Sequence, residues 1–159
     1  VNWHMIGHLQ KNKIKYIINK VTLIHSVDSE ALLLEINTHA KAKNYIQDVL
    51  IQLNISEEAT KFGIKKDELD KTLEYASTLE NIRVKGLMTM GSQLYTRDEN
   101  KKLFEICNKL FIDNQTKTYH NIHMEYLSMG MSGDFEDAIL MGANIVRIGT
   151  GIFGNRNYI

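Results

Sequence analysis

Short apolar runs alternate along this chain with longer stretches in which apolar residues recur every three or four positions. Runs of the first kind predict β-strands, and the second pattern predicts amphipathic helices. The expected strands cover residues 3–7, 21–27, 49–55, 82–88, 123–127 and 145–148. Helices are expected over residues 9–19, after an N-cap at Asp28 or Ser29, and over about 65–79, 97–114 and 134–141.

Alternation of six strands with five helices predicts a parallel sheet joined by βαβ crossovers. The strands are almost continuously apolar, as expected of strands covered on both faces. No glycine-rich dinucleotide fingerprint follows the first strand, so nothing supports a Rossmann fold. A complete α/β barrel takes about 200 residues or more and eight strands. We therefore expect a single α/β domain over residues 1–159, an incomplete TIM-like barrel of about six of the eight βα units.

The amino-acid composition argues against several classes of function. The 159 residues are 43% hydrophobic, and 19 basic side chains balance 19 acidic ones. This balance gives no electrostatic footprint for nucleic acid or an anionic membrane surface, and the longest apolar runs fall far short of the ~20 residues of a membrane helix. The single cysteine, Cys107, excludes an internal disulfide and suits the reducing cytoplasm, and its apolar helical neighbours predict a core position.

The chain opens on Val1 in what reads as a strand already under way, with no initiator methionine. We expect that a segment preceding Val1 is missing, whether naturally or by truncation. Two absent strands would leave open barrel edges whose unpaired backbone groups invite pairing with another chain, and hence a dimer.

Candidate chemistry gathers where the last two strands end, because function in parallel α/β folds lies at the carboxyl ends of the strands. Residues 127–134 lead through Ser132 into a helix, and residues 146–154 contain three glycines and Thr150. Helix N-termini and glycine-rich turns offer backbone N–H groups to an anion. Ser132 alone could be a plain N-cap. The two turns together match the recurrent phosphate site of barrels.

Two further polar groups stand out. Arg147 lies within an apolar strand, where a buried guanidinium needs a partner. It could pair with Asp134 or Glu136, or donate a hydrogen bond to a ligand. His4 and His8 would lie about 13 Å apart along one strand, too far for one zinc ion. At most one of these histidines could reach a site at the strand end, and His8 is better placed.

Several segments together resemble the pyridoxal phosphate homeostasis protein family, which is related to the N-terminal barrel domain of alanine racemase. They are Trp3–Gln10, Gln52–Asn54 with Glu58, Lys61 and Gly63, Gly86–Met88, Leu127–Asp134 and Val146–Tyr158. The resemblance implies a TIM-like barrel that holds pyridoxal 5′-phosphate (PLP) in the cytoplasm. It also implies a monomer with a role in vitamin B6 and amino-acid homeostasis and no established catalytic activity.

The resemblance also implies roles for individual residues. Ser132 resembles the phosphate-binding hydroxyl, and Gly149 and Thr150 complete that cradle. Arg147 resembles the arginine that faces the pyridine nitrogen. His8 is expected near the cofactor, and Ser128 is a further candidate. The resemblance implies no metal and no catalytic residue.

One departure from the family pattern matters for function. In the family, the lysine that forms the Schiff base with PLP lies on the first strand, upstream of the Trp-His motif. No lysine of this chain occupies the matching position. The leading hypothesis is therefore a PLP-binding, non-catalytic homeostasis protein. The alternatives are a PLP-dependent amino-acid racemase-type enzyme, and a cofactor-free barrel fragment that needs its N-terminal segment.

Overall fold

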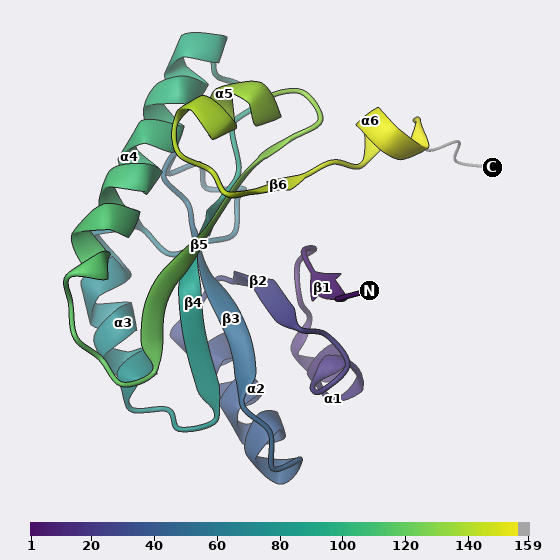
Figure 1. Cartoon of the computed structure of the whole chain (residues 1–159), viewed down its shortest axis with the longest axis vertical. Helices are drawn as coiled ribbons and strands as arrows, with labels where there is room; N and C mark the ends of the chain where they lie inside the picture. Colours follow the sequence, from purple (N-terminus) through teal and green to yellow (C-terminus); the bar gives the residue numbers. More distant parts are fainter. Residues whose placement is uncertain (156–159) are drawn as a thin grey trace.

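The computed structural model describes residues 1–155 and contains one sheet of six parallel strands that pair in sequence order (Figure 1). The strands are β1 (His4–Met5), β2 (Leu23–Val27), β3 (Gln47–Leu53), β4 (Ile82–Thr89), β5 (Ile122–Met131) and β6 (Ile145–Arg147). The α-helices are α1 (Ile14–Ile17), α2 (Glu30–Ala42), α3 (Leu69–Ser77), α4 (Arg97–Gln115), α5 (Phe135–Leu140) and α6 (Thr150–Phe153). Short 3₁₀ helices, Lys11–Lys13 and Lys66–Glu68, precede α1 and α3.

The two faces of the sheet carry different layers. On the outer face, the main core joins strand residues such as Val49 and Val84 to helix residues such as Leu33 and Phe104. On the inner face, Leu23, Leu50 and Met88 form a smaller cluster that contains no helix residue. Helices on one side and a small inner core on the other are the layers of an α/β barrel. The predicted incomplete TIM-like barrel is confirmed as a curled half-barrel.

Irregular pairing bends the sheet. The register shifts once within each of the four strand pairs from β2–β3 to β5–β6, and such bulges increase twist and curvature. Gly86 marks one of the shifts. Its φ is +145°, and a Cβ atom there would lie 1.9 Å from the carbonyl oxygen of Tyr126. Glycine thus permits a close approach of β4 to β5 that any other residue would obstruct.

Helices α2 and α4 begin where the sequence predicts, and each has a side-chain N-cap. Ser29 Oγ accepts from the backbone N–H of Leu32 at the start of α2. Thr96 and Glu99 form a capping box at the start of α4. Among residues 1–155, no helix has both the length and the apolar character to cross a membrane.

Three details differ from the sequence-based expectation. The helix expected over residues 9–19 is shortened to a 3₁₀ turn and one turn of α1. The spacing of Leu103, Ile106, Leu110 and Phe111 predicts one buried face of α4; Leu103 and Phe111 are buried, but Ile106 is 41% exposed and Phe104 is buried instead. Strand β5 continues to Met131 through residues that the sequence had suggested were turn. That extension carries Ser128 inside the sheet, where it can reach β6.

Candidate functional site

The turns after β5 and β6 meet at one side chain. Ser132 Oγ accepts hydrogen bonds from the backbone N–H groups of Gly149, at 3.2 Å, and Gly151, at 3.0 Å. At Gly151 a Cβ atom would lie 3.4 Å from Ser132 Oγ, whereas one at Gly149 would have no neighbour within 4 Å. Two N–H donors thus converge on one oxygen at an open turn, and Thr150 between them is exposed. The same donors could hold a phosphate oxygen.

Arg147 lies on β6 beside this turn. Its register partner on β5 is Met131, the residue before Ser132. The side chain is 8% exposed, and its Nη1 donates to Ser128 Oγ at 2.8 Å while Nη2 donates to the Thr89 carbonyl at 2.9 Å. Within residues 1–155 it forms no ion pair. The suggested pairing with Asp134 or Glu136 is therefore wrong.

The Arg147 guanidinium is buried and is hydrogen-bonded to neutral oxygens, and this environment affects its pKa. Burial lowers the pKa of Arg147 to about 10, although the nearby Asp134 acts in the opposite direction. Arg147 therefore keeps its charge at neutral pH. Two of its five N–H donors bind Ser128 and Thr89, and the other three have no acceptor among residues 1–155.

Ser128 and His25 support the arginine from inside the sheet. Ser128 is fully buried, and its Oγ lies 2.9 Å from Nδ1 of His25 on β2. Nε2 of His25 lies 3.0 Å from Nδ1 of His4 on β1. Sequence reasoning missed His4, His25 and Thr89 as parts of the site. The one signal in the sequence for these residues was His25, a histidine inside the β-branched run 21–27.

His8 lies elsewhere. β1 ends at Met5, so the premise that His4 and His8 share one strand is wrong. The ring of His8 stacks on Phe62 at 3.9 Å, and its Nδ1 lies 3.3 Å from Asp28 Oδ2. It lines a pocket of about 430 Å³ together with Lys61. Within residues 1–155, no hydrogen bond or ion pair joins His8 to the turn around Ser132 or to Arg147.

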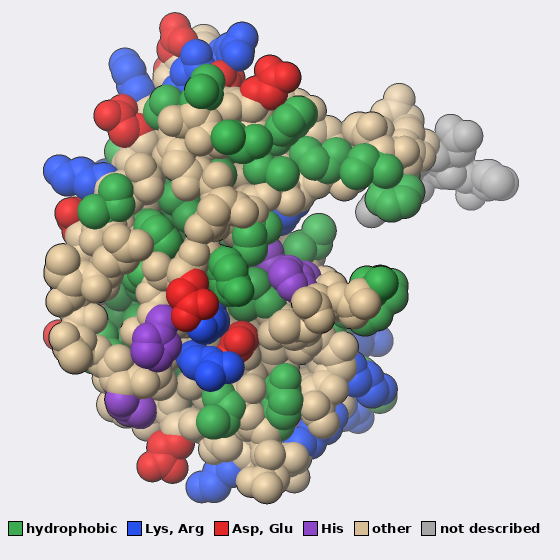
Figure 2. Space-filling model, in the orientation of Figure 1, with side chains coloured by type: hydrophobic (Ala, Val, Ile, Leu, Met, Phe, Trp, Pro, Cys, Tyr) green, Lys and Arg blue, Asp and Glu red, His purple; other side chains and the backbone are tan. Residues whose placement is uncertain are grey.

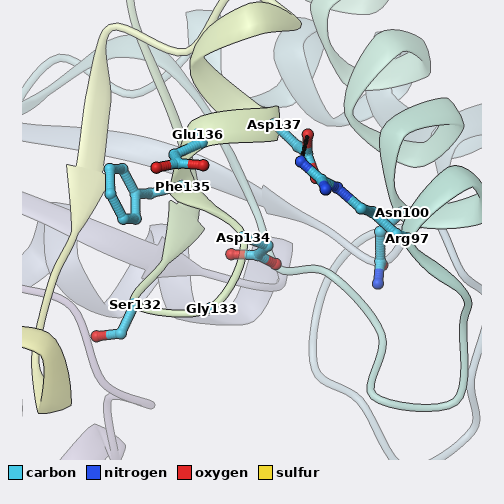
Figure 3. A pocket seen from close by; sticks show the side chains of 8 residues that line it. All are labelled: Arg97, Asn100, Ser132, Gly133, Asp134, Phe135, Glu136 and Asp137. Atoms are coloured by element: carbon cyan, nitrogen blue, oxygen red, sulfur yellow. Dashed lines mark hydrogen bonds and ion pairs between the residues drawn. The ribbon is translucent and has the colours of Figure 1, made fainter.

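A second pocket of about 430 Å³ lies on the far side of Ser132 (Figure 3). Asp134, Glu136 and Asp137 line it, and the ion pair with Arg97 holds the pKa of Asp137 below its ordinary value. Figure 3 shows the Ser132 hydroxyl directed away from these carboxylates. The carboxylates that line this pocket disfavour an anion such as phosphate.

Metal ligation has no structural basis in the described part of the chain, where no group of three or more His, Cys, Asp or Glu side chains could hold an ion. Cys107 is buried, as predicted, and burial raises its pKa to about 12. The turn around Ser132 and the buried Arg147 are thus the candidate site features that lie together. Part of the final motif, residues 156–158, lies outside the described residues.

The chain forms a parallel half-barrel whose last two strands end in turns that meet at Ser132, and the family model of the alanine racemase N-terminal domain matches residues 2–157. A relative from Aquifex aeolicus named pyridoxal phosphate homeostasis protein is 44% identical over 99% of this chain and 68% of its own length. The Escherichia coli K12 protein of that name is 35% identical over 99% of this chain and 66% of its own. The chain belongs to the pyridoxal phosphate homeostasis protein family.

Solved structures agree with this assignment. PipY from Synechococcus elongatus, determined with PLP bound, is 29% identical and superimposes with a TM-score of 0.85. The match covers 97% of this chain and 71% of PipY. The PLP-free form of PipY gives a TM-score of 0.89 at 30% identity. The chain therefore spans about two thirds to seven tenths of the length of these relatives.

Proposed function

We propose that this chain binds PLP without catalysing a reaction of its own, as a protein of vitamin B6 and amino-acid homeostasis. One observation carries the proposal. Two backbone N–H groups converge on Ser132 Oγ beside a strand that presents a fixed, charged Arg147. The names of the relatives and the PLP bound to PipY support the same ligand.

The phosphate end of the proposed site is the turn between β6 and α6. The N–H groups of Gly149 and Gly151 already point at an oxygen, and the Ser132 hydroxyl can itself donate. Thr150 adds a second hydroxyl at the exposed start of α6. A dianionic phosphate accepts several such charge-assisted hydrogen bonds.

The ring end of the proposed site is Arg147. PLP, when bound, supplies an electron-withdrawing pyridine ring. Arg147 donates hydrogen bonds and keeps its proton at neutral pH, so it leaves the ring nitrogen unprotonated. An unprotonated ring withdraws electrons weakly. This suits storage and carriage better than carbanion chemistry, and it supports the non-catalytic half of the proposal.

The test is a PLP titration of the purified chain by visible absorbance, followed by borohydride reduction and intact mass. We expect a shifted absorbance band without retained mass. Ser132→Ala should weaken binding about tenfold, because it removes a hydroxyl at the phosphate end. Ser77→Ala, on the exposed surface of α3, is the matched control and should bind as the wild type does.

The alternatives give different results. Absence of any spectral change would favour the cofactor-free fragment. Mass retained on one lysine after reduction would identify a covalent anchor. Racemisation of alanine or serine by the PLP-loaded chain would contradict the non-catalytic proposal. Binding that Ser132→Ala leaves unchanged would contradict the proposed phosphate cradle.

His8 remains a separate prediction. Its stacking on Phe62 and its pairing with Asp28 do not connect it to the cradle. If it lies near the cofactor, as the family resemblance implies, His8→Ala should also weaken PLP binding in the same titration.

A further inference from the structure

A continuous series of side-chain hydrogen bonds crosses the inner face of the half-barrel. It runs from His4 on β1 to His25 on β2, then to Ser128 on β5 and Arg147 on β6. The joining distances are 3.0, 2.9 and 2.8 Å. His25 and Ser128 are 103 residues apart in sequence, and both are almost completely buried. In Figure 2, histidine side chains are visible in the hollow on this side of the molecule.

The series has a defined direction because its last member can only donate. Arg147 has no acceptor atom, so Ser128 Oγ accepts from it. Within residues 1–155, the other hydrogen-bond partner of Ser128 Oγ is Nδ1 of His25. The serine hydrogen is satisfied only if it goes to that nitrogen, which must then be unprotonated. The proton of a neutral His25 therefore lies on Nε2 and is donated to Nδ1 of His4.

The environment of His25 keeps this arrangement in place. Burial, together with the nearby His4 and Arg147, lowers the pKa of His25 to about 3. A neutral imidazole has one donor and one acceptor nitrogen, and here both are used. A protonated His25 would turn its Nδ1 from an acceptor into a donor, which would reverse the hydrogen bond with Ser128 and leave the serine hydrogen without an acceptor.

We infer that His25 is a positioning residue that orients Arg147 through Ser128, and that His4 accepts the remaining proton of His25. The guanidinium is then held at two points, by Ser128 on one nitrogen and by the Thr89 carbonyl on the other. Its remaining donors face a ligand in one orientation. The orientation of these donors toward a ligand rests on the proposed function, in which the ring nitrogen of PLP accepts a hydrogen bond from Arg147.

A buried histidine could also act only as a space-filling core residue, and substitutions separate the two roles. His25→Asn places an amide oxygen near the former Nδ1 and can still accept from Ser128. His25→Leu fills similar space and accepts nothing. His39→Leu, on α2 and outside the series, is the matched control for loss of a partly buried histidine.

The first measurement uses the PLP-free protein. Side-chain ¹⁵N NMR should show His25 as the Nε2–H tautomer, and the Nη protons of Arg147 should be resolved because the guanidinium is held. His25→Leu should merge those Nη signals by faster rotation, while His25→Asn and His39→Leu should leave them resolved. An Nδ1–H tautomer at His25, or Nη signals that His25→Leu does not change, would overturn the inference.

The second measurement is the PLP titration. His25→Leu should weaken binding about tenfold, because it leaves the Ser128 hydroxyl without an acceptor and loosens Arg147. His25→Asn should stay within about threefold of the wild type, and His39→Leu should match it. Equal binding by His25→Leu and the wild type would overturn the positioning role. If the wild type binds no PLP, the proposed function fails. The NMR spectra of the PLP-free protein would still show which nitrogen of His25 carries the proton and whether Arg147 is held.

Discussion

At the scale of single residues, the buried polar groups of the inner face are stabilised by neutral partners. Arg147 is bound by a hydroxyl and a carbonyl, and His25 by a hydroxyl and another imidazole. Charged pairs occur on the same face nearer the amino ends of the strands, where Arg83 binds Asp48 at 2.7 Å and Lys85 binds Glu125. The hydrogen bond to Asp48 raises the pKa of Arg83. The inner face thus separates ion pairs from the buried polar groups that have neutral partners.

The neutral state of His25 predicts a pH-dependent stability. The pKa of His25 is about 3 in the folded chain, against an ordinary histidine pKa of 6.5, so the unfolded chain binds more protons between these values. The contribution of His25 is fully present above about pH 6.5 and is lost as the pH falls toward 3, by at most about 1.4 kcal/mol per pH unit. Urea unfolding at several pH values should show a flatter profile for His25→Asn than for the wild type.

The control for this experiment is His39→Asn, which removes a histidine from α2 outside the inner face. Its profile should follow that of the wild type. Parallel profiles for His25→Asn and the wild type between pH 6.5 and 4 would show that His25 is not held neutral.

Residue-level sequence reasoning identified Ser132, Gly149 and Arg147 because each is unusual for its local pattern. A serine before a helix, glycines after a strand and a charge in an apolar run are visible without a structure. Of the partners of Arg147, Ser128 was a candidate only through the family resemblance, and Thr89 was not named, because its sequence position is that of an ordinary strand residue. Their importance depends on which strands adjoin, and that is information about the whole sheet.

At the scale of elements, strand curvature depends on a few backbone positions. The pairing of β4 with β5 at Gly86 is one of them, since a Cβ there would meet the carbonyl of Tyr126. Gly86→Ala should lower the free energy of unfolding by about 3 kcal/mol or more, because it combines a steric clash with an unfavourable φ. Urea denaturation measures this loss.

Gly7→Ala is the matched control, since a Cβ at that position would meet nothing within 4 Å. It should change the stability by less than about 1 kcal/mol. A small effect of Gly86→Ala would contradict the close approach of the two strands.

Element boundaries were predictable where a cap or a β-branched run marked them. Thr96 begins α4 with a capping box, and Ser29 begins α2. Prediction failed where tertiary contacts decide, as in the short α1 and in the extension of β5 to Met131. The face of α4 was misjudged at Ile106, because the helix packs with Phe104 and Cys107 turned inward. Hydrophobic periodicity alone could not decide whether the side of α4 with Ile106 or the adjacent side with Phe104 and Cys107 faces the core.

At the scale of the whole molecule, the described sheet has two edges, at β1 and β6 (Figure 1). Apolar side chains are exposed beside both, with Trp3 68% exposed near β1 and Phe153 85% exposed on α6. Unpaired strand edges with apolar neighbours favour association. We expect this 159-residue chain to self-associate as its concentration rises, and sedimentation velocity measures this directly.

Substitutions locate the contact. Trp3→Lys and Phe153→Lys should each reduce the associated fraction, because a lysine at an edge opposes pairing. Leu94→Lys replaces an equally exposed apolar residue between β4 and α4, away from both edges, and should have no effect. A concentration-independent monomer would show that the edges do not pair.

The hydrogen bonds of the site close loops of very different length. Ser132 bonds to Gly151 across 19 residues, whereas His25 bonds to Ser128 across 103. Closing the longer loop costs about 1.5 kcal/mol more chain entropy. During refolding, the turn around Ser132 should therefore become protected from hydrogen exchange before the sheet is complete. The orientation of Arg147, by contrast, should be acquired last, when β2 and β5 come together.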